Sequence, residues 1–436
     1  MTIRRRKRIR FLAILLAAGV AGFLGRDFYG RHKVAVLRAE LRARGERLAL
    51  EEIVEGFSPE AYQTGEDLIK LGEGLPQGFA RPRAMAWIAP GKAEIGSAKP
   101  DVWDPNENVT HTWDEVERDL AAFRPALLVA QVALQRKPVA CRLDYARGFE
   151  ILLPGVSQAK GFSRRFLCAA MEGLHRGDLP VAMTNLLASW TTPHALENDH
   201  LVMSELVRMA ISEESAAVVW EMIHSPGCGE AELAQIAAVA SQLDYAAPMV
   251  RAPEMERAMA LAIFDRVHGW KSGWAGPLEW PFGADLNSAA EQAVLRAFFL
   301  GWKWVWSRGD EYRFLNLIQE VLDVSRELRA SGNYSACRNR MRELDRQISE
   351  LRGVRHLFTH SLITMERNCP ERIALAETGK QLLLTAIAIR RHELRHCRQP
   401  ETLARLVPKY LSELPRDWMN GESLHYRPGT NGNFQL

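Results

Sequence analysis

Residues 392–396 read His-Glu-Leu-Arg-His, which matches the H-E-x-x-H pattern of zinc-binding helices in metallopeptidases. On a helix, His392 and His396 lie one turn apart and have the spacing to bind a tetrahedral zinc ion together. Glu393 would then polarise a zinc-bound water for attack on a peptide bond. The sequence contains no nucleophile elbow, no phosphate-binding loop and no dinucleotide-binding loop, so this pentapeptide alone raises the question of an enzyme.

The helix that carries the two histidines has its apolar stripe on another side. Leu383, Ile387 and Leu394 define the inward stripe, and at 100° per residue His392 lies roughly 140° to 180° from the first two. The histidine pair is therefore expected to face solvent, whereas a catalytic zinc needs a dry, shaped cavity.

The charges and the missing third ligand also argue against a metal. Four cations surround the pair, namely Arg390, Arg391, Arg395 and Arg398. Three further residues have ligating side chains but belong to the C-terminal pattern described below, namely Glu413, Glu422 and His425. We expect no catalytic residue, no metal and no cofactor, with a zinc peptidase built on His392, Glu393 and His396 as the alternative.

The elements that must position these residues belong to an ordinary globular chain. Of 436 residues, 47% are hydrophobic and 25% charged, which excludes collagen-like, disordered and multispanning membrane proteins. A chain of this length exceeds what one core usually serves, so two or three packed units are expected.

Residues 1–30 are predicted to be an N-terminal signal anchor. Six basic residues within residues 4–10 precede FLAILLAAGVAGFLG at residues 11–25, which has no charge. An uncleaved anchor is favoured over a cleaved signal peptide because the following segment stays helical. The positive-inside rule then places a single-pass protein in the inner membrane with its bulk in the periplasm or an equivalent compartment.

The charge of the remaining chain excludes nucleic acid as a partner. Subtracting those six from 56 basic residues leaves 50 against 53 acidic residues, a net charge of −3 for the rest. No basic surface of the kind that binds phosphates is indicated.

Residues 31–55 are predicted to form an amphipathic tether helix. Val34, Leu37, Leu41 and Leu48 have nearly heptad spacing, which would allow a homo-oligomer through this segment. The alternative is a single helix lying on the body, and Gly45, which interrupts the seam, favours it.

The rest of the chain is predicted to be mainly α-helical, with an irregular bundle-like or solenoid-like body. Residues 56–116 are rich in Gly and Pro and are predicted to be irregular. Residues 117–330 form the helical body, residues 331–398 a helical hairpin with a long helix, and residues 399–436 a C-terminal element. Within the body, residues 166–187 resemble one tetratricopeptide-type helix pair with its turn at Gly177-Asp178.

Six of the twelve tryptophans lie within residues 270–306. Trp302, Trp304 and Trp306 would step by about 200° on a helix and so form no single platform. Core packing is the preferred interpretation, and a carbohydrate-binding module or a membrane surface is the alternative.

The six cysteines are scattered, and Cys369 and Cys397 at the two ends of one helix would lie about 40 Å apart, too far to pair. Other pairings stay open.

The last 40 residues resemble the C-terminal region of type II secretion major pseudopilins. A long helix ends in a turn, a leucine-rich segment and a Leu-Pro-x-Asp corner follow, and a strand with Tyr precedes a Gly-containing turn. The matching positions are Arg398, Pro400, Leu403, Leu406, Leu414, Pro415, Asp417, Gly421, Tyr426 and Gly429. Residues 402–411 are expected to be a short helix, and the final residues a β-hairpin.

The resemblance is partial, because Cys397 stands where Gly is usual and the N-terminus lacks the prepilin run that a pilus subunit needs. The whole layout also resembles a group of uncharacterised bacterial envelope proteins. Together these features predict a membrane-anchored, non-enzymatic envelope protein that acts through protein contacts, in an envelope or secretion assembly.

Overall fold

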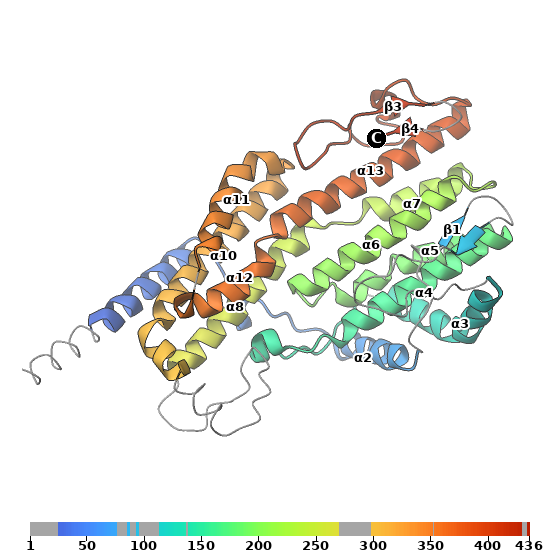
Figure 1. Cartoon of the computed structure of the whole chain (residues 1–436). Helices are drawn as coiled ribbons and strands as arrows, with labels where there is room; N and C mark the ends of the chain where they lie inside the picture. The colour runs from blue at the N-terminus through green and yellow to red at the C-terminus, as the bar shows by residue number, and fades with distance from the viewer. Residues whose placement is uncertain are drawn as a thin grey trace, which may run out of the picture.

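The computed structural model shows an elongated, mainly α-helical molecule (Figure 1). It describes residues 25–75, 85–87, 93–95, 113–136, 138–269, 298–351, 353–429 and 434–436. Among these residues, no helix is both long and apolar enough to cross a membrane. The apolar run predicted to be the anchor lies outside them, except for its last residue, Gly25.

Helices make up most of the described chain. A first helix covers residues 25–43 and a further one residues 298–305. The others are η1 Leu50–Glu52, α2 Pro59–Glu73, α3 Trp113–Gln135, η3 Tyr145–Glu150, α4 Pro154–Arg176, α5 Leu179–Ser189, η4 Thr192–Leu196, α6 Val202–Ile223, α7 Glu230–Ser241, α8 Ala246–Gly269, α10 Ser307–Ser331, α11 Tyr334–Ser349, η5 Val354–His356, α12 Leu357–Glu366, α13 Cys369–His396 and η6 Leu403–Leu406.

The strands are short and form two antiparallel pairs. Strands β1 Met85–Trp87 and β2 Ala93–Ile95 pair with each other, as do β3 Arg427–Pro428 and β4 Phe434–Gln435. Each of these strands is only two or three residues long, so the helices carry the fold.

Helix α13 runs along the molecule and contributes to three apolar cores (Figure 1). Ile373 packs with α8, α10, α11 and α12, Ile387 with α4, α5, α6 and α7, and Ile389 with the C-terminal element. The predicted segments 117–330 and 331–398 therefore share cores and do not fold around separate ones.

The helix of residues 25–43 lies on the body, which is the second of the two arrangements expected for residues 31–55. Leu41 and Leu48 are buried and pack against Leu261 of α8 and Leu315 of α10. Arg38 adds hydrogen bonds to Asp265 at 2.9 and 3.0 Å. The heptad-spaced side chains are thus used within the chain and are not exposed for a second copy.

The prediction that residues 56–116 are irregular is wrong for α2. Ser58 caps this helix by accepting from the Ala61 amide, and Pro59 occupies its first turn. Its glycines, which suggested turns, face close neighbours: a Cβ at Gly65 would lie 2.1 Å from the Ala140 carbonyl oxygen. Glycine here allows close packing and does not end the helix.

The C-terminal element packs along the end of α13. The helix ends at His396, and Cys397 takes the left-handed conformation (φ 52°) that usually favours glycine. The short helix expected over residues 402–411 is wrong in extent, because only η6 forms there, followed by a turn. Tyr426 donates its hydroxyl to the Pro400 carbonyl at 2.9 Å and holds the element against the helix.

Candidate functional site

The two histidines of the zinc-like pentapeptide lie side by side on the last turn of α13. Their ring centroids are 4.4 Å apart, and His396 is exposed whereas His392 is half-buried. His392 donates from Nδ1 to the Arg398 carbonyl at 3.0 Å and lies edge-on to Tyr410. The structure therefore brings the predicted pair together at the surface of the C-terminal element.

Charged side chains next to this pair form ion pairs with other residues. Glu393 pairs with Arg390 at 2.6 Å, and Arg391 pairs with Glu230 of α7 at 2.7 Å. Over the ranges that the structure describes, no three His, Cys, Asp or Glu side chains gather in a way that would hold a metal ion.

The predicted inward stripe of this helix is wrong at one position. Leu394 is 38% exposed, although Ile387 is fully buried as expected. Residues 385–389 are buried on all sides because α6 and α7 cover one face of the helix and the C-terminal element covers another. A single-stripe pattern cannot describe a helix that is covered from two directions.

Trp302 and Trp304 lie on different sides of the helix of residues 298–305, as the 200° spacing predicted. Trp302 is buried against Phe358 and Phe264, with ring centroids 4.7 and 6.5 Å away. Trp304 is 49% exposed. Trp306 is half-buried and packs against the same core as Trp302, so core packing holds for these two. The other tryptophans of the cluster, apart from Trp304, lie outside the described residues.

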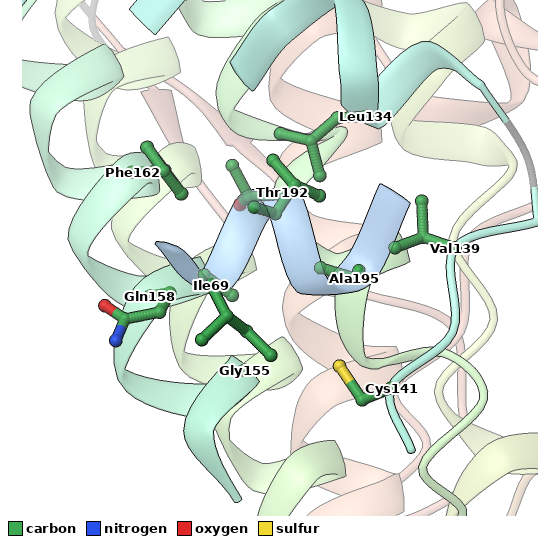
Figure 2. Close-up of a pocket in the computed structure, with 12 residues that line it drawn as sticks. Ile69, Leu134, Val139, Cys141, Gly155, Gln158, Phe162, Thr192 and Ala195 are labelled. Atoms are coloured by element: carbon green, nitrogen blue, oxygen red, sulfur yellow. The ribbon is translucent and has the colours of Figure 1, made fainter. Parts of the chain in front are cut away.

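A small cavity between α2, α4 and η4 is too small to be a site (Figure 2). Its volume is about 10 Å³, which is the space of one water molecule. Leu134, Val139 and Phe162 surround it together with the Cys141 sulfur. Burial, and then the charge of Asp199, raise the pKa of Cys141 to about 12, so the thiol stays protonated and unreactive.

A much larger groove of about 460 Å³ lies where α3 and α5 both pack on α4. These helices occupy the end of the molecule opposite to the helix of residues 25–43 (Figure 1). The groove is lined by Leu120, Arg124, Leu127, Leu128 and Gln131 of α3, by Phe166, Ala169, Glu172, Gly173 and Arg176 of α4, and by Asp178, Pro180, Val181, Thr184 and Asn185 at and within α5. Its volume is in the range of ligand-binding pockets.

The local sequence explains how α4 and α5 form the groove. Gly177 takes the left-handed conformation (φ 75°) that ends α4, and Asp178 caps α5 by accepting from the Val181 amide at 3.2 Å. A Cβ at Gly173 would lie 2.9 Å from the Ala182 nitrogen, so glycine is needed for the two helices to approach. The expected turn is confirmed, but α4 begins at Pro154, well before the predicted pair.

The apolar walls of the groove are open to solvent. Leu128 of α3 is 59% exposed and Val181 of α5 is 40% exposed. Val129 and Val132 of α3 are also more than half exposed, but Val129 lies on the side of the helix away from the residues that line the groove. Exposed apolar side chains in a groove usually mark a site of interaction.

Two arginines line the groove, and within the described part of the chain only Arg176 has acidic partners. Arg176 bonds the buried Glu172 and lies 2.8 Å from Glu117, and the hydrogen bond to Glu172 is the main cause that raises the pKa of Arg176. Arg124 of α3 is exposed, and the structure gives it no ion pair or hydrogen bond within the described part of the chain. The groove thus combines apolar walls with one unpaired positive charge.

Sequence reasoning did not find this groove, although a signal was present. Leu127, Leu128 and Val129 are consecutive in α3, and three successive residues of a helix cannot all face one core.

Comparisons with protein-family models, curated proteins and solved structures gave no match to this chain.

Proposed function

We propose that the protein is a membrane-anchored, non-enzymatic envelope protein that binds a segment of a partner protein in the groove between α3, α4 and α5. The observation that carries the proposal is the groove itself, whose exposed apolar walls at Leu128 and Val181 accompany the unpaired Arg124. Apolar contacts supply affinity in such a groove, and a charge selects the partner.

The partner segment follows from this chemistry. Two apolar side chains fill the groove between α3 and α5, and an acidic side chain or a terminal carboxylate meets Arg124. The small side chain of Ala169, which also lines the groove, leaves room for the backbone of the segment.

The proposed location in the cell is supported by segments of the sequence outside the groove. The apolar run of residues 11–25 after a basic block supports a membrane anchor with the body outside the cytoplasm. Residues 166–187, which line part of the groove, resemble a tetratricopeptide-type helix pair, and stacked repeats of that type form binding surfaces. The resemblance of the tail to pseudopilins favours a secretion or envelope assembly as the setting.

A displayed library tests the groove without knowledge of the partner. The full chain in lipid nanodiscs is used to select random peptides displayed on phage, against empty nanodiscs. Enriched peptides are expected to contain apolar residues together with an acidic one. A synthetic enriched peptide should bind about tenfold more weakly to Val181→Asp and to Arg124→Glu, in line with the loss of one good contact.

The matched control is Val36→Asp, because Val36 is also 40% exposed on a helix but lies outside the groove. This variant should bind the peptide as the wild type does. If no peptide is enriched over empty nanodiscs, or if the groove variants bind an enriched peptide as tightly as the control, the proposal is wrong.

A further inference from the structure

The first turns of the helix of residues 25–43 lie beside the junction between the helix of residues 298–305 and α10. A Cβ at Gly30 would lie 2.9 Å from the Arg308 Cβ, and the Lys33 ammonium lies 5.3 Å from the centre of the Tyr312 ring. The backbone hydrogen bonds continue from Trp302 through Trp306 into α10. Two segments far apart in sequence therefore meet at one end of the molecule, where the chain enters the described structure (Figure 1).

Large apolar side chains are exposed on both of these segments. Phe28 is 74% and Tyr29 is 59% exposed on the first, and on the second Phe298, Leu300 and Trp304 are 37%, 44% and 49% exposed. We call these five residues the aromatic surface. Exposed Trp, Tyr and Phe on one end of a folded domain need a partner that is apolar in part.

Basic side chains accompany the aromatic surface. Arg26, Arg31 and Lys33 are exposed on the first segment, and Asp27 neutralises only Arg31, at 2.6 Å. The Lys303 side chain is buried, and its ammonium lies 5.3 Å from the centre of the Trp304 ring. Aromatic rings and long basic side chains together are the composition of protein surfaces at the membrane–water interface.

The position of the apolar run identifies the partner. The run ends at Gly25, where the described helix begins, and Phe28 follows three residues later. At 1.5 Å per residue this is about 5 Å along the helix, comparable to the roughly 6 Å thickness of a headgroup layer. A bilayer that holds the run must therefore place Phe28 and Tyr29 among its headgroups.

We propose that the aromatic surface docks into the headgroup layer of a bilayer that contains anionic lipid. This inference rests on the proposed anchor and adds a second contact with the membrane, through Trp304 and its neighbours. The body then stands with this end on the membrane, and α3 and α5, which line the groove, lie at the opposite end of the molecule (Figure 1). A partner segment reaches the groove from the aqueous side.

Fluorescence quenching by brominated lipid tests the contact. The full chain is reconstituted into vesicles of phosphatidylcholine and phosphatidylglycerol, with brominated phosphatidylcholine as the quencher. All tryptophans contribute to the emission. The contribution of Trp304 is therefore measured as the difference between wild type and the variant Trp304→Phe. We expect the quenched fraction of the emission to fall in this variant.

The matched control is Trp220→Phe, since Trp220 of α6 is 48% exposed and its ring lies 6.1 Å from that of Phe434 in the C-terminal element, which is not part of the aromatic surface. Its removal should not lower the quenched fraction. If wild type stays with the vesicles after a salt wash and Trp304→Phe is quenched to the same extent as wild type, the anchor holds and the docking surface is wrong. If wild type leaves the vesicles, both ideas are wrong.

Discussion

Arg257 is fully buried and donates a hydrogen bond from Nη2 to Glu46 Oε2 at 2.9 Å. Arg326 and Gln319 also donate to the Glu46 carboxylate. Desolvation opposes ionisation, but the hydrogen bonds from Arg326 and Arg257 outweigh it and lower the pKa of Glu46 to about 2. This carboxylate joins the segment after the first helix to α8 and α10.

Replacing Glu46 by alanine should therefore destabilise the protein strongly. The change leaves the buried Arg257 without its carboxylate partner, and an uncompensated buried charge costs about 3–5 kcal/mol. The free energy of unfolding from urea titration measures the effect. Glu51→Ala is the control, because Glu51 is exposed and has no partner in the described structure. Equal stability of the two variants would contradict this account.

Two glycine substitutions should have effects of opposite sign. At Gly173, alanine places a Cβ 2.9 Å from the backbone nitrogen of Ala182, which cannot move away, so we expect a loss of about 1–3 kcal/mol. At Gly379 in α13, a Cβ meets nothing within 4 Å, and alanine should stabilise the helix by about 0.5–1 kcal/mol. Thermal unfolding of both variants checks this, and a destabilised Gly379→Ala would show that the helix packing is misjudged.

Buried acids at the start of α6 should make stability depend on pH. Burial raises the pKa of both Asp199 and Glu205 to about 7, from ordinary values of 3.8 and 4.5. The folded state thus binds more protons than the unfolded state between those values, and both acids destabilise the fold as pH rises through this window. The free energy of unfolding of Asp199→Asn, relative to that of wild type, should therefore increase from about pH 4 to about pH 8.

Comparing Asp199→Asn with wild type at each pH isolates the contribution of Asp199, because the other titrating groups are the same in both proteins. His268, whose pKa burial lowers to about 3, has the opposite effect below its ordinary value of 6.5. Glu73→Gln serves as the control, since Glu73 is exposed. A stability difference between Asp199→Asn and wild type that does not change with pH would disprove the raised pKa.

The purified full chain should contain no stoichiometric zinc, and His392→Ala should leave its stability within experimental error of wild type. The histidine pair lies at the surface, Glu393 is paired with Arg390, and the positive charges of Arg395, Arg398 and Lys409 near His396 oppose the binding of a dication. Metal analysis after dialysis against a weak chelator provides the measurement. One zinc per chain, lost in His392→Ala together with a peptidase activity that Glu393→Gln abolishes, would establish the zinc peptidase instead.

Local signals in the sequence predicted the ends of helices well. Gly177 and Asp178 mark the turn between α4 and α5, and the long helix ends at His396 as expected. These features depend on residues within one turn of each other, so their physical cause is contained in a short stretch of sequence.

Features that depend on distant neighbours could not be predicted. The Gly and Pro content of residues 56–116 suggested irregular structure, yet at Gly65 the missing side chain makes room for Ala140 within a helix. Leu394 suggested a buried face, yet the C-terminal element covers a different side of α13. The groove requires the relative placement of α3, α4 and α5, and only the unusual apolar run at Leu127, Leu128 and Val129 indicated that one of these helices has an uncovered face.

The long helix α13 also determines when the chain can finish folding. Each of the three cores to which it contributes includes side chains from residues 369–396, so helices synthesised earlier expose apolar faces until this helix arrives. During synthesis or export, the two cores that α13 shares with α4 to α8 are therefore completed only after residues 369–396 have been made. The cluster of α2, α3 and α4 around Phe162 contains no residue of α13 and does not depend on it. A ribosome-bound chain that stops before Cys369 should therefore be cleaved by proteases first in the helices that pack against α13.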